Sequence, residues 1–280
     1  MPASQVFPIF EHQKNTMKNY LFLGLMSSVI FFNSCSSNDD TADEPADKKI
    51  LLSKVTTTYY DDPSKPETTI ETLEYNSQGE LTKTLSASGS STFEYSNGKP
   101  VKINYYNNSQ ELEYYSVFTY NGDQLINIKA IYPNPNSNRT ITYSYNSTGK
   151  VISSSLCQSP DCSNPIIETY TYNGDNISSE TSESGGSSFG TKIVFSHDDK
   201  LNPYTNTNKY LRIMMSKAYA VNKNNYLTEK ISYKDKGTWI QNQTRSSTIQ
   251  YNSSGLPAQV TSKEANGSLS AQYSYEYITQ

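Results

Sequence analysis

The sequence predicts an all-β protein in which residues 50–280 form a single domain of antiparallel β-hairpins. A phrase made of two aromatics, Asn, a tight turn with Gly and an aliphatic residue returns every 20 to 30 residues. Tyrosine is abundant, with 24 among 280 residues, and Ser, Thr and Asn fill many of the positions between. Tyr and Thr are typical of pleated, half-buried strands. Repetition along a chain indicates one supersecondary unit used many times.

The repeated phrase is clearest at residues 143–151, Tyr-Ser-Tyr-Asn-Ser-Thr-Gly-Lys-Val, and residues 73–81 follow the same plan. Its two aromatics lie at i and i+2, so they share one face of a strand and polar residues occupy the other. That alternation is typical of a half-buried strand in an antiparallel sheet. Looser copies lie at residues 93–101, 118–125, 170–177 and 249–256.

The turn in each phrase predicts the register of its hairpin. A type I turn that ends with a left-handed Gly adds a bulge. This places Tyr75 opposite Leu81 and Tyr145 opposite Val151. At residues 121–122 an Asn-Gly pair suits a two-residue type I′ turn. That turn would place Tyr120 opposite Asp123 and Phe118 opposite Leu125.

We expect about a dozen strands in one strongly twisted sheet that curls over its own aromatic face, because twist disfavours a flat sheet of that width. A β-sandwich is the alternative. Residues 205–227 interrupt the repeat, and apolar residues at 209–220 have helical as well as strand spacing. We expect a long connection or at most one short helix there. Trp239, the only Trp, is expected to be in the core or half-buried.

The N-terminal residues predict export. Lys14 and Lys18 precede an apolar run of about a dozen residues, which is too short to span a bilayer and suits a signal peptide. Residues 17–34 are expected to be a lipoprotein signal, because small residues before Cys35 resemble a bacterial lipobox, in which the Cys is lipidated. An ordinary signal peptide that is cut elsewhere and a buried core segment are the alternatives. Residues 1–16 lack signal character, so we expect translation to start at Met17.

Residues 35–49 are polar and acidic, which predicts a disordered tether. Ser-rich, acidic residues after a lipidated Cys resemble the surface-export signal of Bacteroidota lipoproteins. We therefore expect an outer-membrane lipoprotein that faces the cell exterior, with a periplasm-facing one as the alternative. Thr41 resembles the acceptor of a short O-glycosylation motif. The formal net charge is −4 and no basic patch is present, so nucleic acid is not an expected partner.

Cys157 and Cys162 are close in sequence. In an exported protein this spacing predicts a disulfide, with free thiols as the alternative. A metal site would need two further ligands, which the sequence does not nominate. His197 stands beside two aspartates, where a single His is typical of a solvated loop rather than of catalysis. We expect no cofactor, no metal and no catalytic residue.

The sequence has no phosphate-binding Gly-rich loop, no nucleophile elbow and no zinc-helix motif. It favours a non-enzymatic, monomeric binding or adhesion module whose ligand, a glycan or a protein, is unknown. One alternative is a hydrolase acting on glycans with carboxylates from several strands, which spacing along the chain does not reveal. Another is a purely structural or protein-binding scaffold.

The phrase at residues 143–151 resembles the YD repeat of the RHS family, with Asn146 where that family has Asp. The resemblance implies hairpins that wind into long curved sheets. Residues 198–204, Asp-Asp-Lys-Leu-Asn-Pro-Tyr, together with the lipobox, the acidic tether and the Tyr-Asn-Gly hairpins, resemble Bacteroidota surface lipoproteins of the DUF4595 type. This resemblance covers residues 50–280. It implies the fold and the surface location, and it implies no activity.

Overall fold

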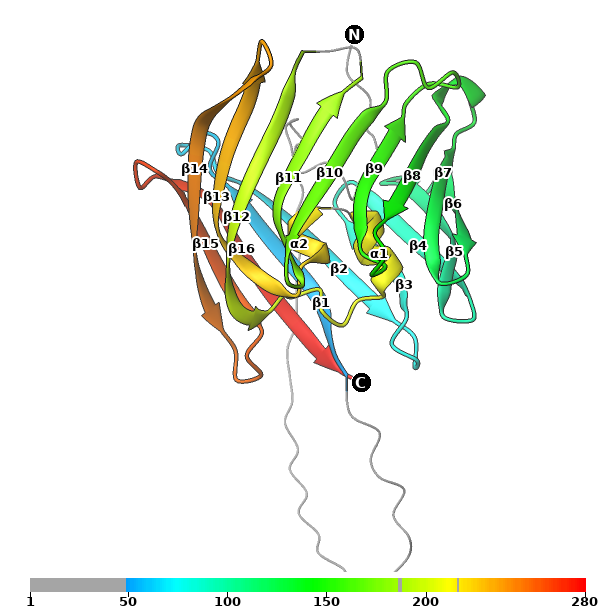
Figure 1. Ribbon diagram of the computed structural model, residues 1–280. Helices are drawn as coiled ribbons and strands as arrows, with labels where there is room; N and C mark the ends of the chain where they lie inside the picture. Colours follow the sequence, from blue (N-terminus) through cyan, green and yellow to red (C-terminus); the bar gives the residue numbers. More distant parts are fainter. Residues whose placement is uncertain (1–48, 186–187, 216) are drawn as a thin grey trace, which may run out of the picture.

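The computed structural model describes residues 49–185, 188–215 and 217–280 (Figure 1). Within these ranges, 16 antiparallel strands form a closed barrel. Every strand pairs with the strands before and after it in the chain, and the first pairs with the last. One 3-10 helix and two short α-helices complete the described elements.

The strands are β1 (Ile50–Tyr59), β2 (Glu67–Tyr75), β3 (Leu81–Ser86), β4 (Gly89–Ser96), β5 (Lys99–Asn107), β6 (Leu112–Asn121), β7 (Gln124–Ile131), β8 (Arg139–Tyr145), β9 (Val151–Cys157), β10 (Ile166–Asn173), β11 (Asn176–Ser184), β12 (Gly190–Leu201), β13 (Asn224–Asp235), β14 (Thr238–Tyr251), β15 (Pro257–Glu264) and β16 (Leu269–Thr279). The helices are the 3-10 helix η1 (Pro135–Ser137), α1 (Lys209–Met215) and α2 (Lys217–Val221).

The prediction of an open, curled sheet was wrong, and so was the alternative of a sandwich, because the sheet closes on itself. β1 pairs with β16 over residues 50–59. Reciprocal backbone hydrogen bonds between Lys49 and Gln280, of 2.7 and 2.9 Å, extend this seam by one pair. Closure satisfies the backbone groups that an open sheet would leave unpaired along its two edge strands.

The repeated Asn has a structural role in the turns. In the β2–β3 turn, Asn76 Oδ1 accepts from the backbone N–H groups of Gln78 and Glu80 at 3.0 and 2.9 Å. Gly79 completes the turn with a φ of 76°, a conformation that Gly adopts without steric cost. The same two side-chain bonds recur in the turns that begin at Asn107, Asn146 and Asn252. Asn is therefore repeated because its side chain closes the turn.

The predicted registers that place Tyr75 opposite Leu81 and Tyr145 opposite Val151 are confirmed. The register predicted from a turn at residues 121–122 was wrong. The turn lies one residue later, at 122–123, so Tyr120 lies opposite Leu125 and not Asp123, and Phe118 lies opposite Ile128 and not Leu125. A bulge just before Tyr120 shifts the register and keeps its ring on the inner face.

Tyrosine hydroxyls join the hairpins to one another. In five of the repeated phrases the second aromatic faces inward and donates to a backbone carbonyl 14 to 23 residues earlier in the chain, and Tyr277 of β16 does the same. The six bonds, of 2.6 to 2.9 Å, run from Tyr75 to Leu52, Tyr95 to Leu81, Tyr120 to Pro100, Tyr145 to Leu125, Tyr172 to Val151 and Tyr277 to Pro257.

We call these six hydrogen bonds the tyrosine ladder. Their acceptor carbonyls occupy the same position relative to the hairpin turns. Five of them, from Leu81 to Pro257, lie opposite the tyrosine of an earlier hairpin, at the bulge that follows its turn. A bulge interrupts the backbone hydrogen bonds between two strands. The hydroxyl of the next tyrosine supplies a partner there, as a buried carbonyl requires.

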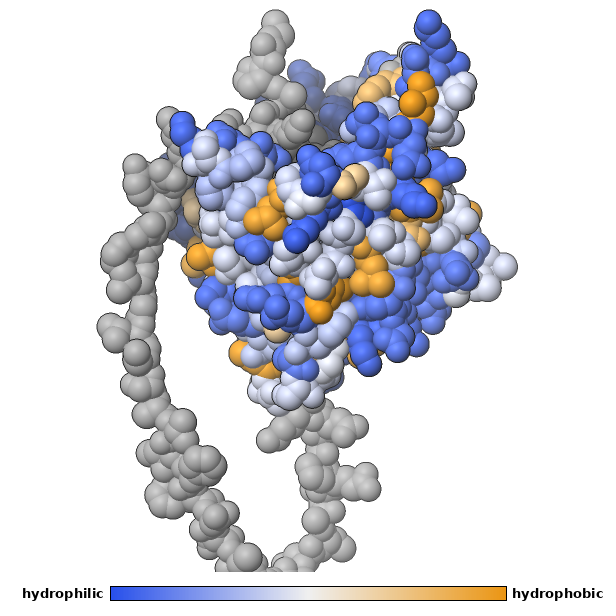
Figure 2. Space-filling model, turned by 90° about the vertical axis from the view of Figure 1, so that its left-hand side faces the viewer, coloured by the Kyte–Doolittle hydropathy of each residue, from blue (hydrophilic) through white to orange (hydrophobic). Residues whose placement is uncertain are grey.

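The two faces of the barrel wall differ in polarity. Aliphatic and aromatic side chains point inward and form the hydrophobic core. The outer face carries mainly Thr, Ser, Lys and Glu, and Figure 2 shows one side of it with only scattered apolar residues. Outward residues at the middle of the strands include Thr56, Thr72, Lys83, Thr92, Lys102, Thr119, Thr142, Ser153, Thr169, Thr181, Lys192, Ser232, Thr244, Lys263 and Ser274.

The tyrosine ladder predicts the effect of removing one hydroxyl. Tyr145→Phe deletes the donor to the Leu125 carbonyl, at 2.6 Å, and leaves that carbonyl without its side-chain partner. We expect the free energy of unfolding to fall by about 1 kcal/mol, as measured by urea denaturation. Tyr115→Phe is the control, because Tyr115 lies on the outer face. Equal stability of the two variants would contradict a stabilising role for the ladder.

Candidate binding cavity

The segment between β12 and β13, residues 202–222, lies inside the barrel and contains both α-helices (Figure 1). We call it the plug. The sequence predicts at most one short helix there, whereas the structure has two, α1 and α2. Tyr210, Leu211, Met214 and Ala218 have exposed fractions of only 1–3%. Helical spacing places these four side chains against the barrel core.

Polar side chains tie the plug to one end of the barrel. The amide groups of Asn206 and Asn208 donate to backbone carbonyls of β1 and of the β4–β5 turn, at 2.8 and 2.9 Å. Lys209 and Tyr210 both bind Asp123 in the β6–β7 turn, and these two hydrogen bonds lower the pKa of that carboxyl to about 2. The plug thus contacts three separate parts of the rim.

Arg212 holds the two ends of the plug together. Its Nε donates to the Ala220 carbonyl at 2.7 Å, and its Nη2 donates to the Asn222 carbonyl at 2.8 Å. Asn222 is fully buried, and its Oδ1 accepts from the backbone N–H of Ile177 in β11 at 2.6 Å. The plug is therefore fixed to the wall on the side of β11 as well.

The plug fills only part of the barrel. The buried members of the hydrophobic core cluster come from β1 to β11 and from the plug. From β12 to β16 this cluster receives only the partly buried Phe195, Tyr275 and Tyr277. Because such side chains point inward by strand alternation and yet keep exposed area, they line open space within the barrel.

Five tyrosines gather beside this space. They are Tyr59 of β1, Tyr273 and Tyr275 of β16, and Tyr204 and Tyr219 of the plug, and we call them the tyrosine cage. The rings of Tyr273 and Tyr275 are nearly parallel, with centroids 6.5 Å apart, whereas those of Tyr204 and Tyr219 meet edge to face at 6.0 Å. Burial raises the pKa of all five hydroxyls, so at neutral pH they are uncharged.

Glu71 is the carboxylate with the largest effect on Tyr219 of the tyrosine cage, and Glu180 and Glu168 lie near the same hydroxyl. Glu71 of β2 lies opposite Val55 of β1, and Val55 lies opposite Tyr275 on its other side. Burial raises the pKa of Glu71 to about 7, and the nearby Glu71 in turn raises the pKa of Tyr204 and Tyr219. In the described parts of the chain, no hydrogen-bond donor and no cation pairs with this carboxylate.

A second group of inward polar residues is satisfied internally. Gln243 and Arg245 of β14 donate to Glu264 of β15 at 2.7 and 2.9 Å. These bonds lower the pKa of Glu264 and, with its charge, raise that of Arg245. The Arg245 charge is thus matched on the wall beside Tyr273, and Glu71 differs from this group in having no such partner.

The residues that the sequence singles out lie away from the tyrosine cage or have structural roles. His197 Nε2 lies 2.8 Å from Asn222 Nδ2, and burial lowers its pKa. Its neighbour Asp198 binds Tyr251 and Asn225. Trp239 is half-buried and lies beside Lys234. Among the described residues, no group of three or more His, Cys, Asp or Glu side chains could hold a metal ion.

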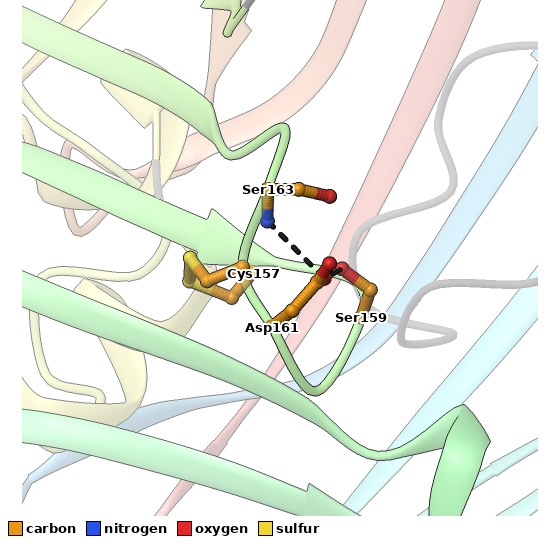
Figure 3. Close-up of a disulfide and its surroundings, with 5 residues drawn as sticks. Cys157, Ser159, Asp161 and Ser163 are labelled. Atoms are coloured by element: carbon orange, nitrogen blue, oxygen red, sulfur yellow. Dashed lines mark hydrogen bonds between the residues drawn. A yellow bond between two sulfur atoms is a disulfide. The ribbon is translucent and has the colours of Figure 1, made fainter.

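Cys157 and Cys162 are joined by a disulfide in the connection between β9 and β10, with Cα atoms 4.8 Å apart. Figure 3 shows Asp161 inside this loop, where its Oδ1 accepts from Ser159 Oγ and the Ser163 N–H at 2.5 and 3.3 Å. These hydrogen bonds lower the pKa of Asp161. The lipidation residue Cys35 and the glycosylation residue Thr41 lie outside the described residues, and their roles stay predictions.

The spacing of residues in β2 could have indicated from the sequence that Glu71 points into the barrel. Glu71, Leu73 and Tyr75 lie at i, i+2 and i+4 of one strand, so the charged residue shares the inward face of the two apolar ones. Likewise, Tyr273 and Tyr275 alternate with polar residues in β16. What the sequence does not contain is their proximity, because β1, β2, β16 and the plug meet only when the barrel closes.

No protein-family model and no curated protein sequence matches this chain. Its fold is similar to the crystal structure of a porin-like protein from Bacteroides uniformis, with a TM-score of 0.51 at 14% sequence identity over 82% of this chain and 98% of that one. A porin-like protein from Bacteroides vulgatus has a TM-score of 0.48 at 9% identity, covering 82% of this chain and 99% of that one. The first similarity supports the barrel fold alone.

The disulfide between Cys157 and Cys162 can be tested directly. Unreduced, purified full chain should be two hydrogen masses lighter in peptides spanning residues 157–162 than after reduction, as measured by mass spectrometry. Because the closed loop is short, Cys157→Ser with Cys162→Ser should lower the free energy of unfolding by only about 2 kcal/mol. Alkylation of both thiols without prior reduction would contradict the disulfide.

The raised pKa of Glu71 predicts a pH-dependent cost. Its folded-state pKa of about 7 lies above that of an unfolded glutamate, so stability is lost as pH rises through this interval. Glu71→Gln should therefore stabilise the protein relative to wild type at about pH 8, by as much as about 3 kcal/mol, and have little effect near pH 4. Urea denaturation at both pH values measures the difference. Glu94→Gln, on the outer face, is the control, and a benefit independent of pH would contradict the assignment.

Proposed function

We propose that this protein is a non-enzymatic lipoprotein of the cell envelope, in which a water-exposed barrel is tethered to the outer membrane through Cys35 and binds a ligand. The observation that carries the proposal is the arrangement of polar residues outside and aromatic residues inside the barrel wall. A transmembrane barrel has the reverse arrangement, with an apolar band about 25 Å tall on its outer face.

The outer face supports a barrel that stands in water. Lys54 and Glu276 form an ion pair of 2.7 Å across the closing seam, and Lys102 pairs with Glu94 at 3.5 Å on the opposite part of the wall. Charged side chains in the middle of a lipid-facing strand would be strongly destabilising, whereas on a wet surface they cost little. No helix in the described part of the chain is long and apolar enough to cross a bilayer.

The interior supports binding rather than conduction. A barrel of 16 strands can enclose an aqueous channel, but here the plug and the aromatic core occupy much of the lumen. What is left is a partly enclosed space lined by tyrosines, and such concave, mainly apolar sites with a few polar groups are typical of ligand pockets. The acidic tether predicted at residues 35–49, whose last residue Lys49 pairs with Gln280 at the barrel seam, would hold this barrel away from the membrane, on the exterior side of the outer membrane.

Lipid attachment and membrane release test the proposal together. Cells given a radiolabelled fatty acid should label the wild type and the Cys157→Ala, Cys162→Ala double variant, but not Cys35→Ala. The unlabelled Cys35→Ala protein should also move from the membrane fraction to the soluble fraction, because the barrel itself does not enter the bilayer.

A Cys35→Ala protein that is folded and still sediments with membranes would contradict a water-exposed barrel. The exterior location is tested by treating intact cells with a protease. We expect the barrel domain to be cleaved or released at its tether, and full protection until the outer membrane is disrupted would place the protein on the periplasmic side.

A further inference from the structure

The residues around the tyrosine cage come from separate parts of the chain, namely β1, β2, β16 and the plug. The floor is formed by Val55 and Thr57 of β1, which have exposed fractions of 9% and 2%. Tyr275 lies opposite Val55, and Tyr273 lies opposite Thr57, so both rings rise from β16 on one side of this floor. On the other side Glu71 of β2 lies opposite Val55.

Two strand spacings of about 4.8 Å separate the backbone of Tyr275 from that of Glu71. The plug covers this site, because Tyr204 and Tyr219 both lie near Tyr273 and Glu71. Tyr204, Tyr273 and Tyr275 are half-buried and keep part of their surface exposed. Their side chains therefore border accessible space.

The charges around the cage are mainly negative, with Glu229 and the paired cation Arg245 near Tyr273 and three carboxylates near Tyr219. Glu71 is the carboxylate nearest to Tyr204, Tyr219 and Tyr75 on the plug and on its own strand, and no described cation pairs with it. The nearest inward cation on β14, Arg245, is already bound to Glu264. Glu71 is half-buried, and a carboxylate that is partly withdrawn from water without a partner is costly. A ligand that supplied a positive charge would remove that cost.

We propose, building on the binding function above, that the tyrosine cage binds an organic cation, with an alkylated ammonium group between the Glu71 carboxylate and the Tyr275 ring. Aromatic faces attract cations through the negative potential of the ring, and cages of several aromatic rings recognise quaternary ammonium groups. A small metal ion does not fit this site, because a single carboxylate cannot supply the six or more oxygen ligands that calcium takes.

Choline chloride and its uncharged carbon analogue, 3,3-dimethylbutan-1-ol, are the probes. They have the same shape and differ only in charge, so their difference in affinity isolates the effect of the cation. Binding is measured by isothermal titration calorimetry on the full chain purified in a nonionic detergent. We expect choline to bind at least about tenfold more tightly than the alcohol at about pH 8.

Two variants assign the site, and two others are controls. Glu71→Gln keeps the shape and should weaken choline binding at least about tenfold while leaving the affinity of the alcohol unchanged. Tyr275→Leu should weaken choline binding as well. Glu94→Gln and Tyr115→Leu, both on the outer face, are the matched controls and should bind like wild type. Because Glu71 must be ionised, choline affinity should also fall as the pH is lowered through about 7.

Equal affinity for the two probes would overturn the proposal in favour of a plain apolar cavity, and absence of choline binding to folded protein would overturn it outright. Binding that Glu71→Gln leaves unchanged would place the cation elsewhere. Circular dichroism of each variant shows whether the barrel is folded. Failure here leaves the membrane tether untouched, because the Cys35→Ala experiments do not depend on the ligand.

Discussion

The hydrogen bond from a tyrosine hydroxyl to a carbonyl of the preceding hairpin is the interaction on which the rest of the barrel depends. The turn of each repeated phrase is accompanied by a bulge, whether it is of the Asn-x-x-Gly type or has two residues. Each bulge leaves a place where the backbone ladder is interrupted. Tyr95, Tyr120 and Tyr145 fill successive interruptions, at 2.9, 2.6 and 2.6 Å. The aromatic and the turn of the repeated phrase are thus two parts of one device. The ring fills the interior, the Asn closes the turn, and the hydroxyl connects one unit to the next.

The turn and the tyrosine hydrogen bond act between hairpins that are adjacent in the sequence. This explains which features could be predicted from the sequence. The alternation of aromatics with Thr and Ser indicated the inward face of each hairpin, and the turn chemistry indicated the register at Tyr75 and Tyr145 correctly. It did not indicate the register correctly at residues 121–122. There the two-residue turn is formed by residues 122–123, and a bulge before Tyr120 shifts the register. Closure was missed for a different reason. Lys54 and Glu276 are 222 residues apart, and no local sequence pattern predicts that β1 and β16 pair.

The candidate site shows the same limit. The sequence places Glu71 on the inward face of its strand, in phase with Leu73 and Tyr75, so a charge inside the core was predictable in principle. Its neighbours were not predictable, because Tyr275 lies two strands away across the closing seam and Tyr219 comes near it from the plug. A carboxylate that lowers stability when ionised is consistent with a position kept for binding and not for folding. The barrel therefore carries this unpaired carboxylate where three distant segments meet.

The anchoring of the plug has a consequence for how this architecture can vary. Asn206 binds β1, Asn208 binds the β4–β5 turn, Lys209 binds the β6–β7 turn, and Asn222 binds β11. These four attachments lie at fixed separations around the barrel, so the plug constrains the number of strands between them. A duplicated hairpin between two attachments would move them apart and break at least one, whereas one inserted in the arc from β14 to β16 would leave all four in place. Divergent copies of this barrel should therefore gain or lose hairpins in that arc, which is also the arc that borders the open part of the lumen.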